Sequence, residues 1–420
     1  MKKIKFILTV FFMFIIYIYV SYISLIPNNI FLLNNEELKL RKLPGIEVVE
    51  TLMTNNSNLE NTINEFRTKS LNNQDINDNV SSTNIELKLF GKILIKNINV
   101  TKIDEMRIVP VGKVIGAKMY TNGVLIVGMS EIEDKYDYIQ KPYENSNIKP
   151  GDTILKINEQ RIEDINNLKQ VVNDSNGKEL TLTLLRNGNI LDTSIIPVEI
   201  SDKKYQLGLW VKDAATGVGT MTFYEPESKC FGILGHGITD TDTSNLINID
   251  YGELVTAKIV SLKRGTPNLP GEIKGTIINS QTIGQITKNT QFGVYGILNN
   301  LTALNIDVSK SIEIASRDEI TESDAKILCS VESSNTSKEY DIKIEKIYKE
   351  NDYNNKSMLI RIVDEELLKQ TGGIIRGLSG APIIQNGKFA GAITNVLVSN
   401  PEVGYAIFAD MMIKELKHLD

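Results

Sequence analysis

A serine between glycines, close to the C-terminus, is the residue best placed for nucleophilic chemistry. Ser379 lies in the run Gly-Leu-Ser-Gly over residues 377–380, ahead of Ala-Pro and two isoleucines. A serine hydroxyl is a weak nucleophile, so an attacking serine needs an exposing backbone and N–H groups aimed at the same point. Flanking glycines permit the positive φ angles and the close substrate approach of such a loop. A glycine-rich turn before a strand is the alternative interpretation, because short motifs of this kind are frequent.

One of the two histidines in the chain is a candidate for the general base. His236 lies between two glycines, directly after the apolar run of residues 231–234. Imidazole titrates near neutral pH and is the usual base for an activated serine. His418 follows a short amphipathic pattern at the C-terminus and is interpreted as solvated. A strand-end histidine bound to backbone is the alternative for His236, but glycines around both residues favour a His236–Ser379 pair.

A third group should orient the histidine. Asp364 ends an apolar strand pattern, fifteen residues before Ser379. Asp240 and Asp242, just after His236, are alternatives. Asp364 also precedes a short helical pattern, so capping that helix is a competing role for its carboxylate.

Composition limits the remaining possibilities. A chain of 420 residues accommodates two or three domains, and the net charge of −6 without a basic stripe argues against a nucleic-acid partner. Two cysteines exclude a disulfide-dense scaffold and a cysteine-rich zinc site. Cys230 and Cys329 both lie in apolar runs, so we expect buried free thiols, with one disulfide between them as the alternative. We expect no metal and no cofactor.

The N-terminus predicts a membrane anchor. Residues 6–26 form an uncharged apolar run of 21 residues preceded by three lysines. As a helix this run is about 30 Å long, enough to cross a bilayer core. The lysines predict the N-terminus inside and the body outside. We expect an uncleaved transmembrane anchor over residues 1–27, with a cleaved secretory signal peptide as the alternative. A polar tether and leading strands should follow over residues 28–100.

Residues 101–200 carry an α+β pattern with a Lys-Pro-Gly-Asp turn at 149–152, between strands and ahead of a helical pattern. Residues 120–123 carry a hairpin signal. The order resembles a bacterial PDZ domain, which adds an extended peptide beside its sheet edge and holds the terminal carboxylate in a loop. A module that only spaces the domains is the alternative. By position the loop would be formed by Val114, Ile115, Gly116 and Ala117.

Residues 201–420 change to short strands separated by glycine-rich turns, which predicts β-barrel architecture and a mainly β chain. The clearest strands are residues 219–223, 257–262, 293–298, 327–331 and 358–363.

The apolar N-terminus, the PDZ-like unit, the Gly-His-Gly segment at 235–237 and the run of residues 371–380 together resemble the stage IV sporulation protein B (SpoIVB) family of serine peptidases. The resemblance covers most of residues 86–420. It implies a chymotrypsin-like double β-barrel over residues 201–420. It also implies His236 as general base, Ser379 as nucleophile, Asp364 as third member, and the backbone N–H groups of Gly377 and Ser379 as the oxyanion hole.

The same resemblance implies a signalling role in endospore formation. Such an enzyme is exported from the forespore, stays on its membrane and faces the space between forespore and mother cell. There it would cut a membrane-associated regulatory protein and so allow activation of the late mother-cell sigma factor. The PDZ domain would bind the substrate or the enzyme's own tail, and self-cleavage in the tether is expected. An HtrA-like quality-control protease, whose PDZ usually follows the catalytic domain, and a catalytically silent PDZ scaffold are the alternatives.

Overall fold

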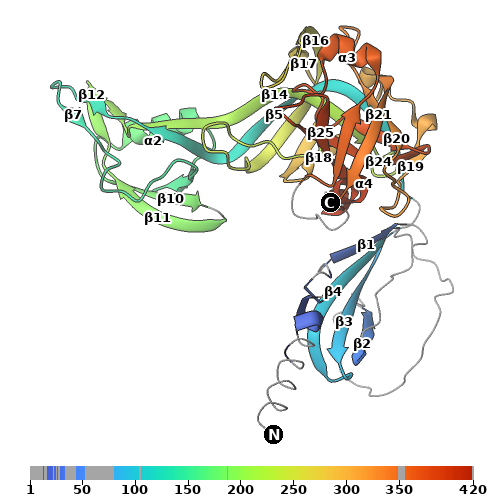
Figure 1. Ribbon diagram of the computed structural model, residues 1–420. Coiled ribbons are helices and arrows are strands. Elements are labelled where there is room, and N and C mark those ends of the chain that lie inside the picture. Colours follow the sequence, from blue (N-terminus) through green and yellow to red (C-terminus); the bar gives the residue numbers. More distant parts are fainter. Residues whose placement is uncertain are drawn as a thin grey trace. The chain divides into compact units, whose positions relative to one another are not determined.

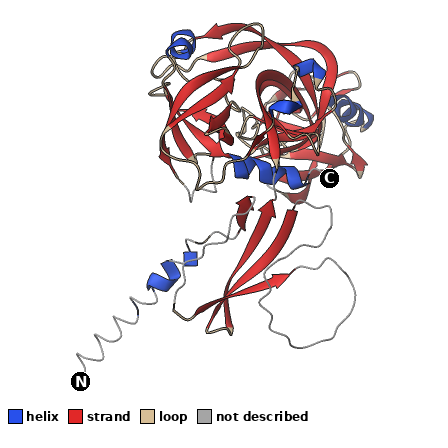
Figure 2. Ribbon diagram, turned by 90° about the vertical axis from the view of Figure 1, so that its right-hand side faces the viewer, coloured by secondary structure: helices blue, strands red, loops and turns tan. Residues whose placement is uncertain are grey.

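The computed structural model describes residues 29–33, 44–52, 80–103, 106–186, 188–348 and 355–418, with residues 13, 17–21, 23, 24 and 26. Strands dominate these residues (Figure 2). Within them, no helix is both long and apolar enough to cross a membrane. Most of the predicted anchor, residues 6–26, and much of the predicted tether lie outside the described residues.

A four-stranded sheet forms the N-terminal unit, with the strand order β1-β4-β3-β2. Its strands are β1 (Asn29–Leu33), β2 (Ile46–Leu52), β3 (Val80–Leu89) and β4 (Ile93–Ile103). Alternate residues such as Ile85 and Leu87 on β3 and Ile98 and Val100 on β4 are buried, because side chains of a strand alternate between its two faces. β1 and β2 lie in the segment predicted as tether. That prediction is wrong for these two stretches, since β1 pairs with β4 and β2 with β3.

Six strands close the first barrel of the larger unit, in the ring order β5–β14–β15–β18–β17–β16, with β16 pairing back onto β5. Their bounds are β5 (Arg107–Met129), β14 (Leu209–Tyr224), β15 (Cys230–Ile233), β16 (Ile249–Lys263), β17 (Glu272–Thr290) and β18 (Gly293–Leu298). Buried side chains from all six strands fill its interior.

The second barrel also closes, in the order β20-β21-β22-β25-β24-β23. Its elements are β20 (Asp324–Cys329), β21 (Lys338–Ile347), β22 (Met358–Ile362), α3 (Glu365–Thr371), β23 (Pro382–Gln385), β24 (Lys388–Val396) and β25 (Val403–Phe408). Short elements complete this part of the chain: η1 (Thr302–Leu304), η2 (Val308–Lys310), β19 (Ile312–Glu313), α4 (Ala409–Ile413) and η3 (Lys414–His418). Two six-stranded barrels agree with the predicted chymotrypsin-like architecture. The cysteines, on β15 and β20, are both buried, and no disulfide joins them.

A small α+β domain is inserted between β5 and β14 of the first barrel. It contains β6 (Ile132–Glu133), β7 (Ile139–Gln140), β8 (Thr153–Ile157), β9 (Gln160–Arg161), α2 (Ile165–Asp174), β10 (Leu180–Arg186), β11 (Asn189–Ile195), β12 (Val198–Ser201) and β13 (Lys204–Gln206). β5 and β14 pair along almost their whole length and form a two-stranded ribbon shared by barrel and inserted domain (Figure 1).

Core membership corrects the predicted domain boundaries. On β5, Ile115 and Met119 belong to the core of the first barrel, whereas Val124 and Ile126 belong to the core of the inserted domain. On β14, Val211 packs against the inserted domain's core. The barrel therefore begins within the segment assigned to the PDZ-like unit, and the peptidase part is discontinuous in sequence.

The hairpin predicted at residues 120–123 does not form. β5 runs through this segment without reversing, and Gly123 adopts a φ of +93° in the middle of the strand. A Cβ atom at Gly123 would lie 2.3 Å from the carbonyl oxygen of Ile154 on β8. The glycine therefore serves the close approach of a neighbouring strand rather than a turn.

Candidate active site

The loop that carries Ser379 connects α3 to β23 and depends on its glycines. Gly377 has a φ of +99° and Gly380 a φ of +94°, conformations that favour glycine. A Cβ atom at Gly380 would lie 2.4 Å from the carbonyl oxygen of Thr220 and 2.6 Å from the backbone nitrogen of Leu234. The serine loop is thereby packed tightly against β14 and the segment that leads to His236.

The backbone of the serine loop leaves two N–H groups available. Leu378 donates its N–H to the Ile375 carbonyl at 3.1 Å, and Gly380 donates to the Ile393 carbonyl at 2.7 Å. Within the described part of the chain, the N–H groups of Gly377 and Ser379 have no hydrogen-bond partner. These are the two donors that the sequence analysis assigned to the oxyanion hole.

The Ser379 hydroxyl is half-buried and donates to the carbonyl oxygen of Thr394 at 2.7 Å. Its proton is therefore held by backbone in this conformation. Attack on a substrate requires the side chain to rotate away from Thr394 toward a base. Catalytic hydrogen bonds are commonly incomplete before substrate binds, so this arrangement is compatible with catalysis.

His236 follows β15 through a strained turn. Leu234 has a φ of +71°, and the N–H of Gly235 donates to the carbonyl of Ile233 at 2.9 Å, which closes a γ-turn around Leu234. A positive φ is rare for a bulky residue and costs on the order of 1 kcal/mol or more. Such strain persists where the surrounding structure fixes a functional geometry.

The histidine ring has its tautomer fixed by backbone. Nδ1 of His236 lies 2.9 Å from the carbonyl oxygen of Gly237. Because a carbonyl oxygen only accepts, this hydrogen bond assigns the proton to Nδ1 and leaves the lone pair on Nε2. Burial lowers the pKa of His236 below its ordinary value. The imidazole is therefore neutral at pH 7 and able to act as a base.

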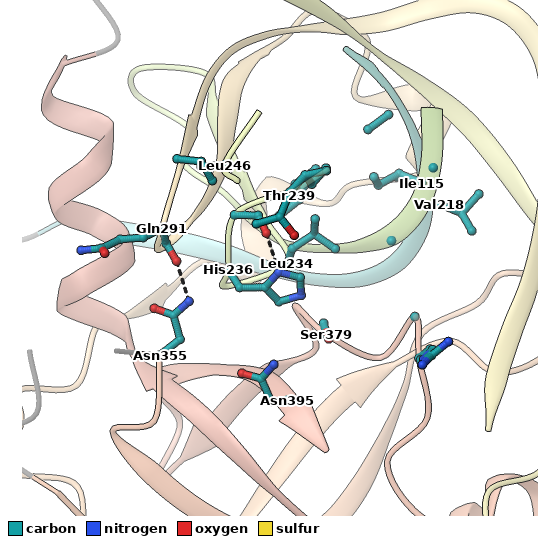
Figure 3. A pocket seen from close by; sticks show the side chains of 18 of the residues that line it. Ile115, Val218, Leu234, His236, Thr239, Leu246, Gln291, Asn355, Ser379 and Asn395 are labelled. Carbon is teal, nitrogen blue, oxygen red and sulfur yellow. Dashed lines mark hydrogen bonds between the residues drawn. The ribbon is translucent and has the colours of Figure 1, made fainter. Parts of the chain in front are cut away.

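One pocket of about 890 Å³ brings His236 and Ser379 together. Figure 3 shows both at this pocket, with the imidazole directed toward the loop of Ser379. The other residues that line it are Ile115, Ala117, Gly217, Val218, Gly219, Ile233, Leu234, Gly237, Ile238, Thr239, Ser244, Leu246, Gln291, Asn355, Arg376, Gly377 and Asn395. The pocket thus combines a nucleophile, a base and available N–H donors.

Asp364 is not among the residues that line this pocket. It is the N-cap of α3, and its carboxylate accepts from the N–H of Leu367 at 2.9 Å and of Asp341 at 3.3 Å. The structure therefore does not bring Asp364 to His236 as the resemblance implied, and gives it the capping role. The physical reason is that a carboxylate at a strand end satisfies the N–H groups of the helix that follows.

The alternative carboxylates are also engaged elsewhere. Asp240 is buried, and Lys212 donates to it at 3.0 Å and also to Asp242. Burial alone would raise the pKa of Asp240, but the hydrogen bonds from Lys212 and from the backbone of Thr243 and Asp242 outweigh it and lower that pKa. Both carboxylates thus fix the loop after His236, and the Gly237 carbonyl holds the imidazole.

The predicted PDZ loop is in a different place. Val114, Ile115, Gly116 and Ala117 lie within β5, where all four pair with β14 of the first barrel. Ile115, Gly116 and Ala117 also pair with β16. Ile115 and Ala117 line the catalytic pocket instead of a carboxylate-binding loop. The prediction is wrong because the strand belongs to the barrel before it enters the inserted domain.

Sequence reasoning missed several groups of the site. No role was predicted for the Thr394 carbonyl that binds Ser379, for the Gly237 carbonyl that binds His236, or for the pocket residues Asn355 and Arg376. Every residue has a backbone carbonyl, so the amino-acid sequence does not show which carbonyl accepts a hydrogen bond from the site. Arg376 could have been noticed as a charge three residues before the predicted nucleophile. Across the described residues, no group of three or more His, Cys, Asp or Glu side chains could hold a metal ion.

Comparison with known proteins adds to this geometry. A family model described as SpoIVB peptidase S55 matches residues 203–413, which is half of the chain, and a PDZ domain model matches residues 125–196. The chain is also similar to the active form of the Rv3671c protease from M. tuberculosis, at 14% identity over 49% of this chain and 74% of that chain, with a TM-score of 0.27. The inactive form of that protease is 13% identical over 48% of this chain and 84% of that chain, with a TM-score of 0.25.

Proposed function

The chain belongs to the SpoIVB peptidase S55 family and is a serine peptidase, and from this premise we propose that it is a signalling endopeptidase of endospore formation. The observation that supports the chemistry best is the shared pocket of His236 and Ser379 beside the available N–H groups of the serine loop. The proposal of a signalling role is supported by the family and by the domain composition, a peptidase combined with a PDZ domain.

In the proposed reaction, the Ser379 hydroxyl leaves the Thr394 carbonyl, gives its proton to Nε2 of His236 and attacks a peptide carbonyl carbon. The resulting oxyanion accepts hydrogen bonds from the N–H groups of Gly377 and Ser379; one such donor typically contributes about 100- to 1,000-fold in turnover. The imidazolium then protonates the leaving amine, and water hydrolyses the acyl-enzyme by the same path. The Gly237 carbonyl holds Nδ1–H throughout.

The proposed substrate is a membrane-associated regulatory protein. The apolar N-terminal run supports a membrane anchor with the peptidase on the extracytoplasmic side, in the space between forespore and mother cell. Cleavage there would remove a block on the late mother-cell sigma factor. The inserted PDZ domain would bind an extended segment of the substrate or of the enzyme's own N-terminal tether.

The role is tested in a spore-forming host that carries this chain in place of its own copy. We expect Ser379→Ala to stop late mother-cell sigma-factor activity and heat-resistant spore formation, while His418→Ala, at the other histidine of the chain, supports both. Normal sporulation with Ser379→Ala would contradict the signalling role. Broad digestion of unfolded casein by the purified chain would favour an HtrA-like role instead.

A further inference from the structure

The charge of the catalytic pocket is carried by one residue. Of the described residues that line it, Arg376 alone bears a permanent charge, His236 is neutral at pH 7, and none is a carboxylate. The chain as a whole carries a net charge of −6. A cationic pocket in an acidic protein is therefore a local feature.

Backbone contacts fix the position of Arg376. Its N–H donates to the Gly271 carbonyl at 3.0 Å, and its carbonyl accepts from the Ile273 N–H at 2.8 Å, which makes a parallel bridge with Glu272. It stands three residues before Ser379, at the base of the serine loop. The backbone of Arg376 is thus held in place at the pocket that contains the nucleophile.

The Arg376 side chain is exposed and has no ion-pair partner among the described residues. Bridge partners project from the same side of a sheet, so Glu272 is the nearest candidate, yet no ion pair within 4.0 Å joins them. Lys263 lies opposite Glu272 in the β16–β17 register. This row of three residues therefore holds two cations and one carboxylate, and Arg376 is the member that lines the pocket.

We propose that Arg376 is a specificity-determining residue that binds an acidic side chain, Asp or Glu, close to the scissile bond of the substrate. A guanidinium binds a carboxylate through two parallel N–H···O bonds, and an occupied pocket excludes the water that would weaken them. A lysine or arginine at the same substrate position would be repelled, which adds discrimination. The inference rests on the peptidase activity assigned to this pocket and narrows its substrate class.

The test uses the full-length chain in detergent micelles and a mixed-sequence peptide library, with cleavage products identified by mass spectrometry. We expect Asp and Glu to be enriched at one position next to the cleaved bond. Matched peptides with Glu, Gln or Lys there should then give about a tenfold higher kcat/KM for Glu than for Gln, the size of one charge-assisted contact. Added salt should reduce this ratio.

Variants locate the effect. Arg376→Gln should bring the Glu/Gln ratio of kcat/KM to about one, and Arg376→Lys should keep part of the wild-type ratio. Arg376→Glu should cleave the Lys peptide faster than the Glu peptide. Lys343→Gln, which removes an exposed cation from β21 of the second barrel, is the matched control and should keep the full ratio. Because each ratio compares peptides on one enzyme, a partial loss of folded protein does not change it.

The possible results separate the two claims. Ser379-dependent cleavage without an acidic preference, or with the same ratio in wild type and Arg376→Gln, would overturn the role of Arg376 and leave the peptidase intact. Absence of any cleavage that Ser379→Ala abolishes would overturn the proposed function, and this inference with it. If Arg376→Gln does not fold, the Glu/Gln ratio of Arg376→Lys and the effect of salt on the wild-type ratio still test the role of Arg376.

Discussion

Asp364 could cap helix α3 or act as the third member of a catalytic triad, and the two roles predict effects of measurably different size. As the N-cap of α3, its carboxylate binds the N–H groups of Leu367 and Asp341. Removing such a cap costs about 1 kcal/mol of unfolding free energy, which lowers Tm by about 2–4 °C in a domain of this size. As a member of a catalytic triad, the same side chain would contribute about 10,000-fold to turnover. The two roles therefore predict losses in different observables.

Asp364→Asn and Asp364→Ala separate these roles. Asparagine caps a helix about as well as aspartate, so Asp364→Asn should lose only the charge near the helix N-terminus, about 0.5 kcal/mol. Asp364→Ala should lose the full cap. Asp164→Ala is the matched control, because Asp164 caps α2 in the PDZ domain through the Asn167 N–H at 2.7 Å.

The assay combines thermal unfolding with the rate of fluorophosphonate labelling, measured well below Tm. We expect Asp364→Ala and Asp164→Ala to lower Tm by similar amounts and Asp364→Asn to lower it less, with labelling rates within a few-fold of wild type. A loss of 100-fold or more in labelling by Asp364→Asn at unchanged Tm would refute this reasoning. It would mean that Asp364 reaches His236 in an active conformation.

Three further predictions concern other parts of the molecule. Because burial lowers the pKa of His236, the labelling rate should stay constant through neutral pH and fall only below pH 6.5, the ordinary pKa of histidine. The unfolded state binds this proton more readily than the folded state, so the free energy of unfolding should fall over the same acid range. A labelling rate that already falls with acid above pH 7 would contradict the assignment. Arg186 donates to both carboxylate oxygens of the buried Asp152 at 2.6 Å, so Arg186→Met should lower the unfolding free energy of the PDZ domain by about 3 kcal/mol in denaturant unfolding. Lys156→Met, which removes an exposed ion pair with Glu159 at 3.4 Å, should cost less than about 1 kcal/mol. Gly380→Ala would place a Cβ 2.4 Å from a carbonyl oxygen of β14 and should lower both Tm and the labelling rate; a variant with wild-type values would show that the loop is not held as described.

The sequence predicted the elements whose signal is local. The strands of both barrels follow from short apolar runs between glycine-rich turns, and the serine and histidine loops from glycines around a reactive residue. All five strands named from the sequence overlap observed strands, at β14, β16, β18, β20 and β22. Gly377 and Gly380 have positive φ angles, as a loop that exposes a nucleophile requires.

The parts that the sequence did not predict depend on long-range pairing. The sequence of β5 predicts strand on both sides of a hairpin signal, and only its partners in space decide that the strand continues, with Ile115 in the barrel and Val124 in the PDZ domain. The insertion of one domain between two strands of another leaves no compositional boundary. By sequence, Asp364 is equally suited to capping a helix and to orienting the catalytic histidine. Only its neighbours in space distinguish these two roles. The backbone acceptors of His236 and Ser379 have no sequence signal.

The claim that His236 and Ser379 form one catalytic unit is tested most directly by fluorophosphonate labelling of the full-length chain. Wild type should label at Ser379, identified by mass spectrometry of the modified peptide. Ser379→Ala and His236→Ala should both lose labelling while keeping the wild-type Tm within a few degrees, and His418→Ala should label as wild type does. Labelling that persists in folded His236→Ala at the wild-type rate, or that maps to another serine, would contradict the account.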